Sequence, residues 1–288
     1  MRHLLLTTMT LIAALLYSAP SQAQSEEWTR PFPPFRIIGN VYWVGSYELP
    51  TYLIATPAGH ILVNTGVEHT ADRIKSSVEA LGFRLEDTKI LTATHGHYDH
   101  VSSLAALKAI TGARLLVAEQ DRSLYETGGA TDFRTVDTSN ERFPAVAVDG
   151  TFTDGGTISL GGTTIVAHHH GGHTKGATSF TLTVRESGRD YRVIIANMPS
   201  IIPGMAVSGM ASYPGITEDY ARTFAAQKKM DVDVWLAAHA SQFGLHRKYA
   251  PGDAYDPNRF VDPQGFRAAV LDLERAYLEQ LTRERGRR

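Results

Sequence analysis

The chain has 288 residues, a formal net charge of −2 and an apolar share of 43%. This near-neutral balance gives no electrostatic basis for binding nucleic acid or an anionic membrane surface. The chain has 12 histidines and no cysteine, which excludes a disulfide framework and leaves imidazole and carboxylate groups as the only ligands for a zinc site.

The first 23 residues have the order of a secretory signal peptide. Met1-Arg2-His3 is a short basic start, an apolar run follows from Leu4 to Tyr17, and Ser21-Gln22-Ala23 supplies small residues for cleavage. The apolar run is shorter than the about 20 residues that a membrane-spanning helix needs, so a membrane anchor is the weaker interpretation. We expect a secreted protein, periplasmic if the host is Gram-negative, whose mature chain is residues 24–288.

The first half of the mature chain predicts an antiparallel meander followed by alternating helices and strands. Three prolines between residues 31 and 34 form an extended lead-in. Turn residues then separate short β-type runs, and we expect strands at 35–38, 41–44, 52–56 and 61–63. Thr70 is the expected N-cap of a helix that ends before Gly82. A strand at 89–94, a helix at 101–110 and a strand at 115–118 are expected to follow.

The second half repeats this order of elements. Gly161-Gly162 between two β-type runs indicates a hairpin. The expected strands are 157–160, 163–167, 180–184, 191–196 and 232–237. A helix at 218–230 is expected behind Thr217 as its N-cap, and a last helix begins at Asp262-Pro263. Because each half has strands first and helices interleaved later, we expect one domain, residues 24–288, built from two similar αβ layers.

The strongest functional signal is the segment Thr94-His95-Gly96-His97-Tyr98-Asp99-His100, between an expected strand and an expected helix. Alternate residues of an extended turn face the same way, so His95 and His97 can share one metal ion. Asp99 and His100 begin the next turn and can face a second ion. Imidazole and carboxylate are the ligands that zinc takes where sulfur is missing, so this segment predicts a metal site.

Two later histidines stand at positions that suit further ligands. His173 lies in the glycine-rich turn Gly171-Gly172-His173-Thr174-Lys175-Gly176, and His239 follows an expected buried strand. A lone histidine in either place is more often structural, but the first motif favours ligand roles for both. His168, His169 and His170 directly precede the turn, and exposure at the end of a strand is the simpler expectation for them.

These motifs resemble the metallo-β-lactamase superfamily, from Pro31 to about Leu281. More narrowly, the chain is similar to the third subclass of metallo-β-lactamases, which uses three histidines plus Asp-His-His and no metal-binding cysteine. The resemblance implies an α+β fold, a four-layer αβ/βα sandwich with the metals at the edge where its halves meet. The implied sets are His95, His97 and His173 for the first of two zinc ions, and Asp99, His100 and His239 for the second. Asn197 and Ser200 occupy the region where that subclass binds the substrate carboxylate.

The resemblance leads to a specific hypothesis about the reaction. Zinc lowers the pKa of a bound water to about 7, so a hydroxide oriented by Asp99 could attack the carbonyl of a β-lactam ring. Related thioesterases and lactonases carry a bridging Asp after the strand that follows the Gly-His turn, whereas this chain has Asn197 there, which favours the β-lactamase branch. The alternatives are a secreted lactonase or esterase acting on acyl-homoserine lactones, and a zinc-binding scaffold without activity. We expect a monomer with a small-molecule substrate and no nucleic-acid partner.

Overall fold

The structure is a computed structural model that describes residues 26–134 and 137–287. The predicted signal peptide, residues 1–23, lies outside the described residues. Within the described ranges, no helix is both long enough and apolar enough to cross a bilayer.

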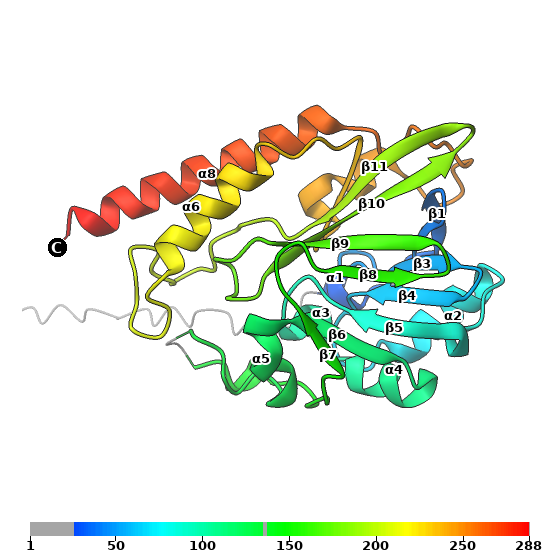
Figure 1. Ribbon diagram of the computed structural model, residues 1–288, viewed down its shortest axis with the longest axis horizontal. Helices are drawn as coiled ribbons and strands as arrows, with labels where there is room; N and C mark the ends of the chain where they lie inside the picture. Colours follow the sequence, from blue (N-terminus) through cyan, green and yellow to red (C-terminus); the bar gives the residue numbers. More distant parts are fainter. Residues whose placement is uncertain (1–25, 135–136, 288) are drawn as a thin grey trace, which may run out of the picture.

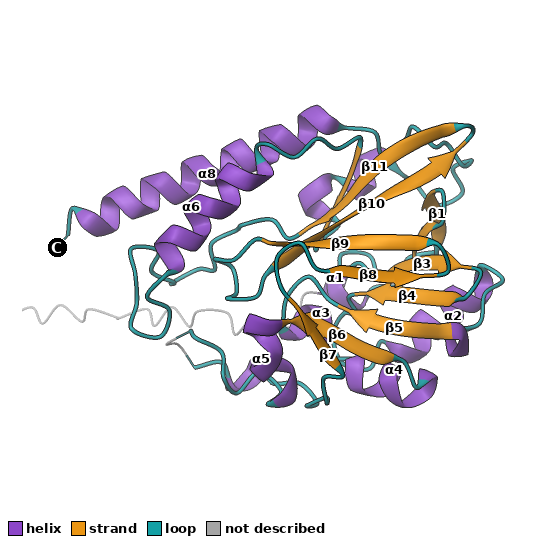
Figure 2. Ribbon diagram, viewed as in Figure 1, coloured by secondary structure: helices purple, strands orange, loops and turns teal. Residues whose placement is uncertain are grey.

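Two β-sheets pack face to face, and helices cover the outer face of each (Figure 1). The four layers, helix, sheet, sheet and helix, stand out in Figure 2 and confirm the predicted αβ/βα sandwich. The first sheet has seven strands in chain order: β1 Phe35–Ile38, β2 Val41–Trp43, β3 Tyr52–Thr56, β4 Gly59–Val63, β5 Thr88–Thr92, β6 Arg114–Ala118 and β7 Gly150–Phe152. The second has five strands in the order β12-β11-β10-β9-β8: β8 Thr157–Leu160, β9 Thr163–His169, β10 Thr178–Glu186, β11 Arg189–Ala196 and β12 Val234–Ala237.

Strand alternation explains why the first sheet is buried on both faces. Successive side chains of a strand point to opposite faces. On β4, Ile61 and Val63 belong to the core between the sheets, whereas Leu62 belongs to the core beneath the helices. Leu53 of β3 lies on the same outer face as Leu62, its partner in the antiparallel pair. Two apolar cores therefore hold the sheet in place.

The helices form two separate groups. The helices named in the structure are α1 Glu26–Thr29, α2 Ala71–Ala80, α3 Tyr98–Val101, α4 Leu104–Thr111, α5 Arg122–Glu126, α6 Ile216–Gln227, α7 Leu245–Lys248 and α8 Pro263–Arg285. Helices α2 and α4 cover the first sheet, and α6 and α8 cover the second (Figure 1). The predicted start of α8 is confirmed, because Asp262 accepts a hydrogen bond of 2.9 Å from Gly265 N as its N-cap.

The helix predicted at 101–110 is wrong, because the structure has two helices there, α3 and α4. The loop after β4 interrupts it: Thr65 N donates to the carbonyl of His100 at 2.7 Å, and Ser103 Oγ donates to the carbonyl of Val67 at 2.8 Å. These long-range bonds tie the junction between α3 and α4 to the loop after β4.

Of the two predicted N-caps, one is confirmed in position and the other is wrong. Thr70 is the N-cap residue of α2, but its side chain bonds no helix N–H, because its hydroxyl donates to the carbonyls of Thr65 and Val67. Thr217 lies inside the first turn of α6, where Gly215 is the N-cap, and its hydroxyl donates to Val207 O at 2.6 Å. In both cases a carbonyl outside the helix takes the hydroxyl that a cap would use.

Candidate metal centre

Three loops carry the predicted ligands to one place. The first follows β5, the second joins β9 to β10, and the third follows β12. They bring together the first-set residues His95, His97 and His173, whose ligand atoms all lie within 4.8 Å of one another. The same limit holds for His95, Asp99 and His100. Residues from both sheets therefore meet in one cluster.

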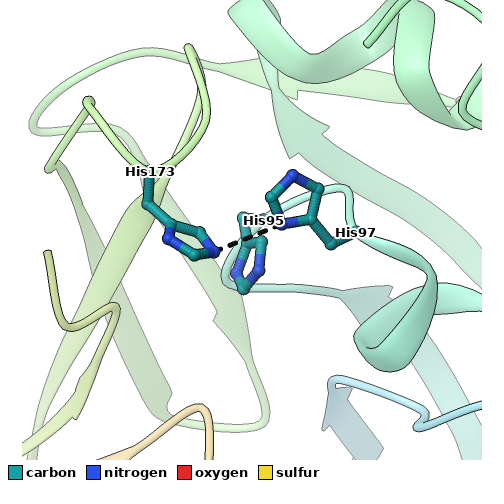
Figure 3. A group of neighbouring side chains, drawn as sticks. All are labelled: His95, His97 and His173. Carbon is teal, nitrogen blue, oxygen red and sulfur yellow. Dashed lines mark hydrogen bonds between the residues drawn. The ribbon is translucent and has the colours of Figure 1, made fainter. Parts of the chain in front are cut away.

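The first-set imidazoles face one another around a common point (Figure 3). His97 Nδ1 and His173 Nε2 lie 3.2 Å apart. Two nitrogens bound to one tetrahedral zinc at about 2.0–2.1 Å each would be about 3.3 Å apart. The observed spacing therefore suits two ligands of one ion.

The second set lies directly beside the first. His95 and His100 have ring centroids 4.4 Å apart, and those of His100 and His239 are 4.9 Å apart. Asp99 Oδ2 lies 3.0 Å from His100 Nε2 and 3.4 Å from His239 Nε2. One carboxylate oxygen thus faces both histidines of this set, and the two sets form one continuous group.

The electrostatics of the cluster favour a cation. Burial, with repulsion from His97, lowers the pKa of His173 to about 3, and burial likewise holds the pKa of His95 well below its usual value. Both rings are therefore neutral at pH 7 and have a lone pair to offer. Burial alone would raise the pKa of Asp99, but His100 and His239 outweigh it and hold that pKa well below its usual value. Neutral imidazoles around an ionised carboxylate suit a bound metal.

An unpaired nitrogen in the cluster tests whether the residues suit a metal ion. His95 Nε2 is buried, with no hydrogen-bond partner among the described residues. A buried polar atom left without a partner costs about 1–3 kcal/mol. Coordination would satisfy this nitrogen, so the donor set present here fits the metal ions that the motif predicts.

The orientation of His95 follows from a short chain of hydrogen bonds. Asn64, which has φ +64, accepts bonds from Thr94 N at 2.9 Å and Thr94 Oγ1 at 3.2 Å. The same hydroxyl lies 3.2 Å from His95 Nδ1. With the hydroxyl donating to Asn64, Nδ1–H of His95 donates to the hydroxyl, and Nε2 is left with its lone pair for a metal.

A buried aspartate that the sequence analysis missed joins two of the loops. Asp121 accepts hydrogen bonds from Gly96 N at 3.2 Å, Thr174 Oγ1 at 2.6 Å and Gly176 N at 2.6 Å. A Cβ on Gly176 would lie 2.7 Å from Asp121 Cγ, so only glycine lets the loop come this close. No spacing in the sequence links Asp121 to the histidine motifs, and only the fold identifies it.

The two predicted substrate-binding residues have different positions. Asn197 is 1% exposed, and its backbone carbonyl accepts a bond of 2.9 Å from Gln227 Nε2. Ser200 is half-buried beside the cluster, where its carbonyl accepts a bond of 2.9 Å from His173 Nδ1. Direct contact with a substrate is therefore open to Ser200, and Asn197 lies beneath the surface.

The remaining histidines and one aromatic residue complete the surroundings. The expectation of exposed strand-end residues is wrong for His170, which is 2% exposed and lies 2.7 Å from Ser179 Oγ through Nδ1. His168 and His169 are half-buried.

Trp28 of α1, which the sequence analysis did not single out, has its ring 6.2 Å from that of His239 and 5.8 Å from that of Tyr98. An aromatic wall therefore stands beside the second set.

The comparisons with known proteins agree with this geometry. Residues 50–185 match the metallo-β-lactamase superfamily. A β-lactamase from Chitinophaga pinensis is 42% identical, with a TM-score of 0.88 and coverage of 92% of this chain and 99% of that chain. The class B3 di-zinc metallo-β-lactamase LRA-12 from an Alaskan soil metagenome is 43% identical, with a TM-score of 0.87 and coverage of 91% and 98%. A probable metallo-hydrolase of Burkholderia pseudomallei is 30% identical over 128 residues, which make up 43% of this chain and only 40% of that protein.

Proposed function

Because the chain belongs to the metallo-β-lactamase superfamily, we propose that it is a secreted dizinc hydrolase that opens the β-lactam ring of antibiotics. The observation that carries the proposal is the convergence of six side chains that can ligate metal in a chain 42–43% identical to β-lactamases over almost their full length. The order of residues 1–23 supports export, which suits an enzyme that meets its antibiotic outside the cytoplasm.

The proposed ligands divide into two sets. His95, His97 and His173 would hold the first ion, and Asp99, His100 and His239 the second. Zinc bound by these residues would supply Lewis-acid polarisation of the scissile carbonyl and acidify a water molecule to a pKa of about 7.

The residues of the chain contribute orientation and a shaped wall. The ionised carboxylate of Asp99 accepts a hydrogen bond from the attacking water and fixes its direction. Ser200 holds His173 through its carbonyl, and its half-buried hydroxyl, 3.4 Å from His173 Nδ1, would bind the substrate carboxylate. Trp28 and Tyr98 form an apolar surface for the rest of the substrate.

The residue after β11 favours a β-lactam over a lactone or thioester. A carboxylate in this region would bridge two metal ions, and the chain has the neutral Asn197 there. Its side-chain Nδ2 is buried with no hydrogen-bond partner among the described residues. This donor cannot replace a bridging oxygen.

A rate panel tests the proposal. The purified protein is assayed with a penicillin, a cephalosporin, a carbapenem and an acyl-homoserine lactone, before and after dialysis against a chelator. We expect the β-lactams to have the highest kcat/KM and chelation to abolish their turnover. Asp99→Ala should lower kcat at least 100-fold while the circular dichroism spectrum stays unchanged. A lactone processed far faster than every β-lactam, or turnover that survives complete metal removal, would overturn the proposal.

A further inference from the structure

We propose that two carboxylates outside the ligand sets, Asp132 and Glu48, are positioning residues that set the metal affinity of the two sites separately. Asp132 would act on the site of His97, and Glu48 on the site of His239. This inference rests on the proposed function, because it assumes that both sites bind metal.

Glu48 lies behind His239 and holds its ring. The Glu48 carboxylate is 3.5 Å from His239 Nδ1, while the other ring nitrogen, Nε2, is 3.4 Å from Asp99 Oδ2. The ring therefore lies between two carboxylates, with Nε2 directed into the ligand set.

The loop after β12 anchors Glu48 in turn. Ser241 Oγ donates to Glu48 Oε1 at 2.5 Å, and Ser241 N lies 3.2 Å from Oε2. The backbone takes part as well, since Ala240 N donates to Glu48 O at 2.8 Å. Glu48 is buried, so these contacts exchange little with water. The carboxylate is a fixed support for His239.

Asp132 stands in the equivalent relation to His97. Its Oδ2 is 3.6 Å from His97 Nε2, and the other ring nitrogen, Nδ1, is 3.2 Å from His173 Nε2. Arg134 donates two hydrogen bonds to the same oxygen, from Nε at 3.0 Å and from Nη2 at 2.7 Å. Its Nη2 also donates to Glu141 at 2.6 Å. The Asp132 side chain is largely buried, and Arg134 fixes it beside His97 Nε2, a buried nitrogen with no hydrogen-bond partner among the described residues.

Among residues 26–134 and 137–287, no carboxylate outside the ligand sets pairs with His95, His100 or His173. His95 faces the hydroxyl of Thr94 and His173 the carbonyl of Ser200. Each set therefore contains one histidine supported by an outer carboxylate. Such a partner fixes the tautomer and orientation of an imidazole and makes it a stronger ligand, and its loss typically costs 10–100-fold in metal affinity. The two supports lie behind different sets, so their effects should be separable.

The test removes one carboxylate at a time and measures zinc affinity by competition with a chromophoric chelator. Glu48→Gln and Asp132→Asn are each combined with His173→Ala, which disables the first site, and with His239→Ala, which disables the second. With His173→Ala, we expect E48Q to weaken the remaining site about 10–100-fold and D132N to leave it unchanged. With His239→Ala, we expect D132N to weaken the remaining site about 10–100-fold and E48Q to leave it unchanged. Glu126→Gln, in a surface pair with Arg122, is the matched control.

The outcomes separate this inference from the proposed function. Wild-type protein that binds no zinc contradicts the function itself. Wild-type protein that binds two equivalents, with E48Q and D132N weakening both sites equally or neither, overturns only the positioning roles. If E48Q or D132N does not fold, Ser241→Ala and Arg134→Lys release the same carboxylates from their anchors and should weaken the same sites. The melting temperatures of the metal-free variants are measured in parallel. A purely structural effect would lower the melting temperature and would not weaken zinc binding at one site more than at the other.

Discussion

Gly172 lies directly against the ring of Tyr220: a Cβ added to this glycine would be 2.9–3.0 Å from three atoms of that ring. The backbone at Gly172 also has φ +125, which side-chain-bearing residues rarely adopt. The Tyr220 hydroxyl donates to Ser200 O at 3.0 Å, and the same carbonyl accepts from His173 Nδ1. The close packing of these two residues is therefore part of what holds His173 in place.

Gly172→Ala should displace this contact and turn His173. We expect a loss of stability of about 1–3 kcal/mol from backbone strain and overpacking, together with at least a tenfold loss of kcat/KM. Gly188→Ala is the control, because Gly188 has φ +82 but no atom within 4 Å of the added Cβ. Wild-type kinetics in Gly172→Ala would show that His173 does not depend on this packing.

Asp121→Asn should destabilise the protein by about 3 kcal/mol in urea unfolding. The carboxylate accepts three hydrogen bonds from the two ligand loops, and an amide has only one oxygen to receive them. The exposed Asp190 provides the matched control, Asp190→Asn, with an expected change under 0.5 kcal/mol. A change of similar size in both variants would mean that Asp121 does not join the loops.

His170 should make the metal-free protein sensitive to mild acid. Burial, reinforced by repulsion from His168, lowers the pKa of His170 to about 3. Above pH 6.5 the ring is neutral in both states, so it contributes no pH dependence. Below that value the unfolded chain gains a proton that the folded chain refuses, and stability falls by about 1.4 kcal/mol per pH unit.

The variant His170→Asn keeps an acceptor near Ser179 but does not titrate. Between pH 6.5 and pH 5, wild-type protein should lose about 2 kcal/mol more of its unfolding free energy than this variant, in urea titrations with chelator present. Equal losses in the two proteins would show that His170 is protonated in the folded state.

Trp28→Ala should raise KM for β-lactams severalfold and leave kcat nearly unchanged. The indole lies beside His239 and Tyr98 at the side of the second set, so it adds apolar contact area and no chemistry. Trp28→Phe should recover most of the affinity. Steady-state kinetics decide the point, and a fall in kcat with constant KM would contradict a role limited to binding.

Removal of metal should lower the melting temperature by about 5–10 °C. The ligands come from both sheets, so bound metal stabilises the folded state alone, by about 2.7 kcal/mol at a free concentration 100 times Kd. Differential scanning fluorimetry with and without chelator gives the shift, and added zinc should restore it. An unchanged melting temperature at saturating zinc would argue against binding between the two halves.

Local signals in the sequence were sufficient for every described strand except β7, which was not predicted, and for the residues that cluster. The turn residues that bound β3, the alternation along β10, the glycine pair before β9 and the cap of α8 are decided within a few residues. The spacing around His95 likewise identified a group that the fold assembles. Alternation and motif spacing are local properties, and the structure agrees with them where no distant segment intervenes.

The remaining features depend on contacts between distant segments. The hydroxyl of Ser103, between α3 and α4, donates to the carbonyl of Val67 in a distant loop. His170 is buried beneath α6, where Gln227 contacts its ring. Glu48 and Asp132 have no motif around them, and their roles appear only when the loops meet. Single-sequence patterns carry no information about such pairings.

The placement of His239 after β12 has a consequence for synthesis. A nascent chain on the ribosome exposes the histidine-rich segment early, but the strand that carries His239 is made last among the ligand-bearing elements. A product truncated before β12 would lack both this histidine and the anchor for Glu48. Only a chain that extends through Ser241 contains all six ligands and the anchor of Glu48.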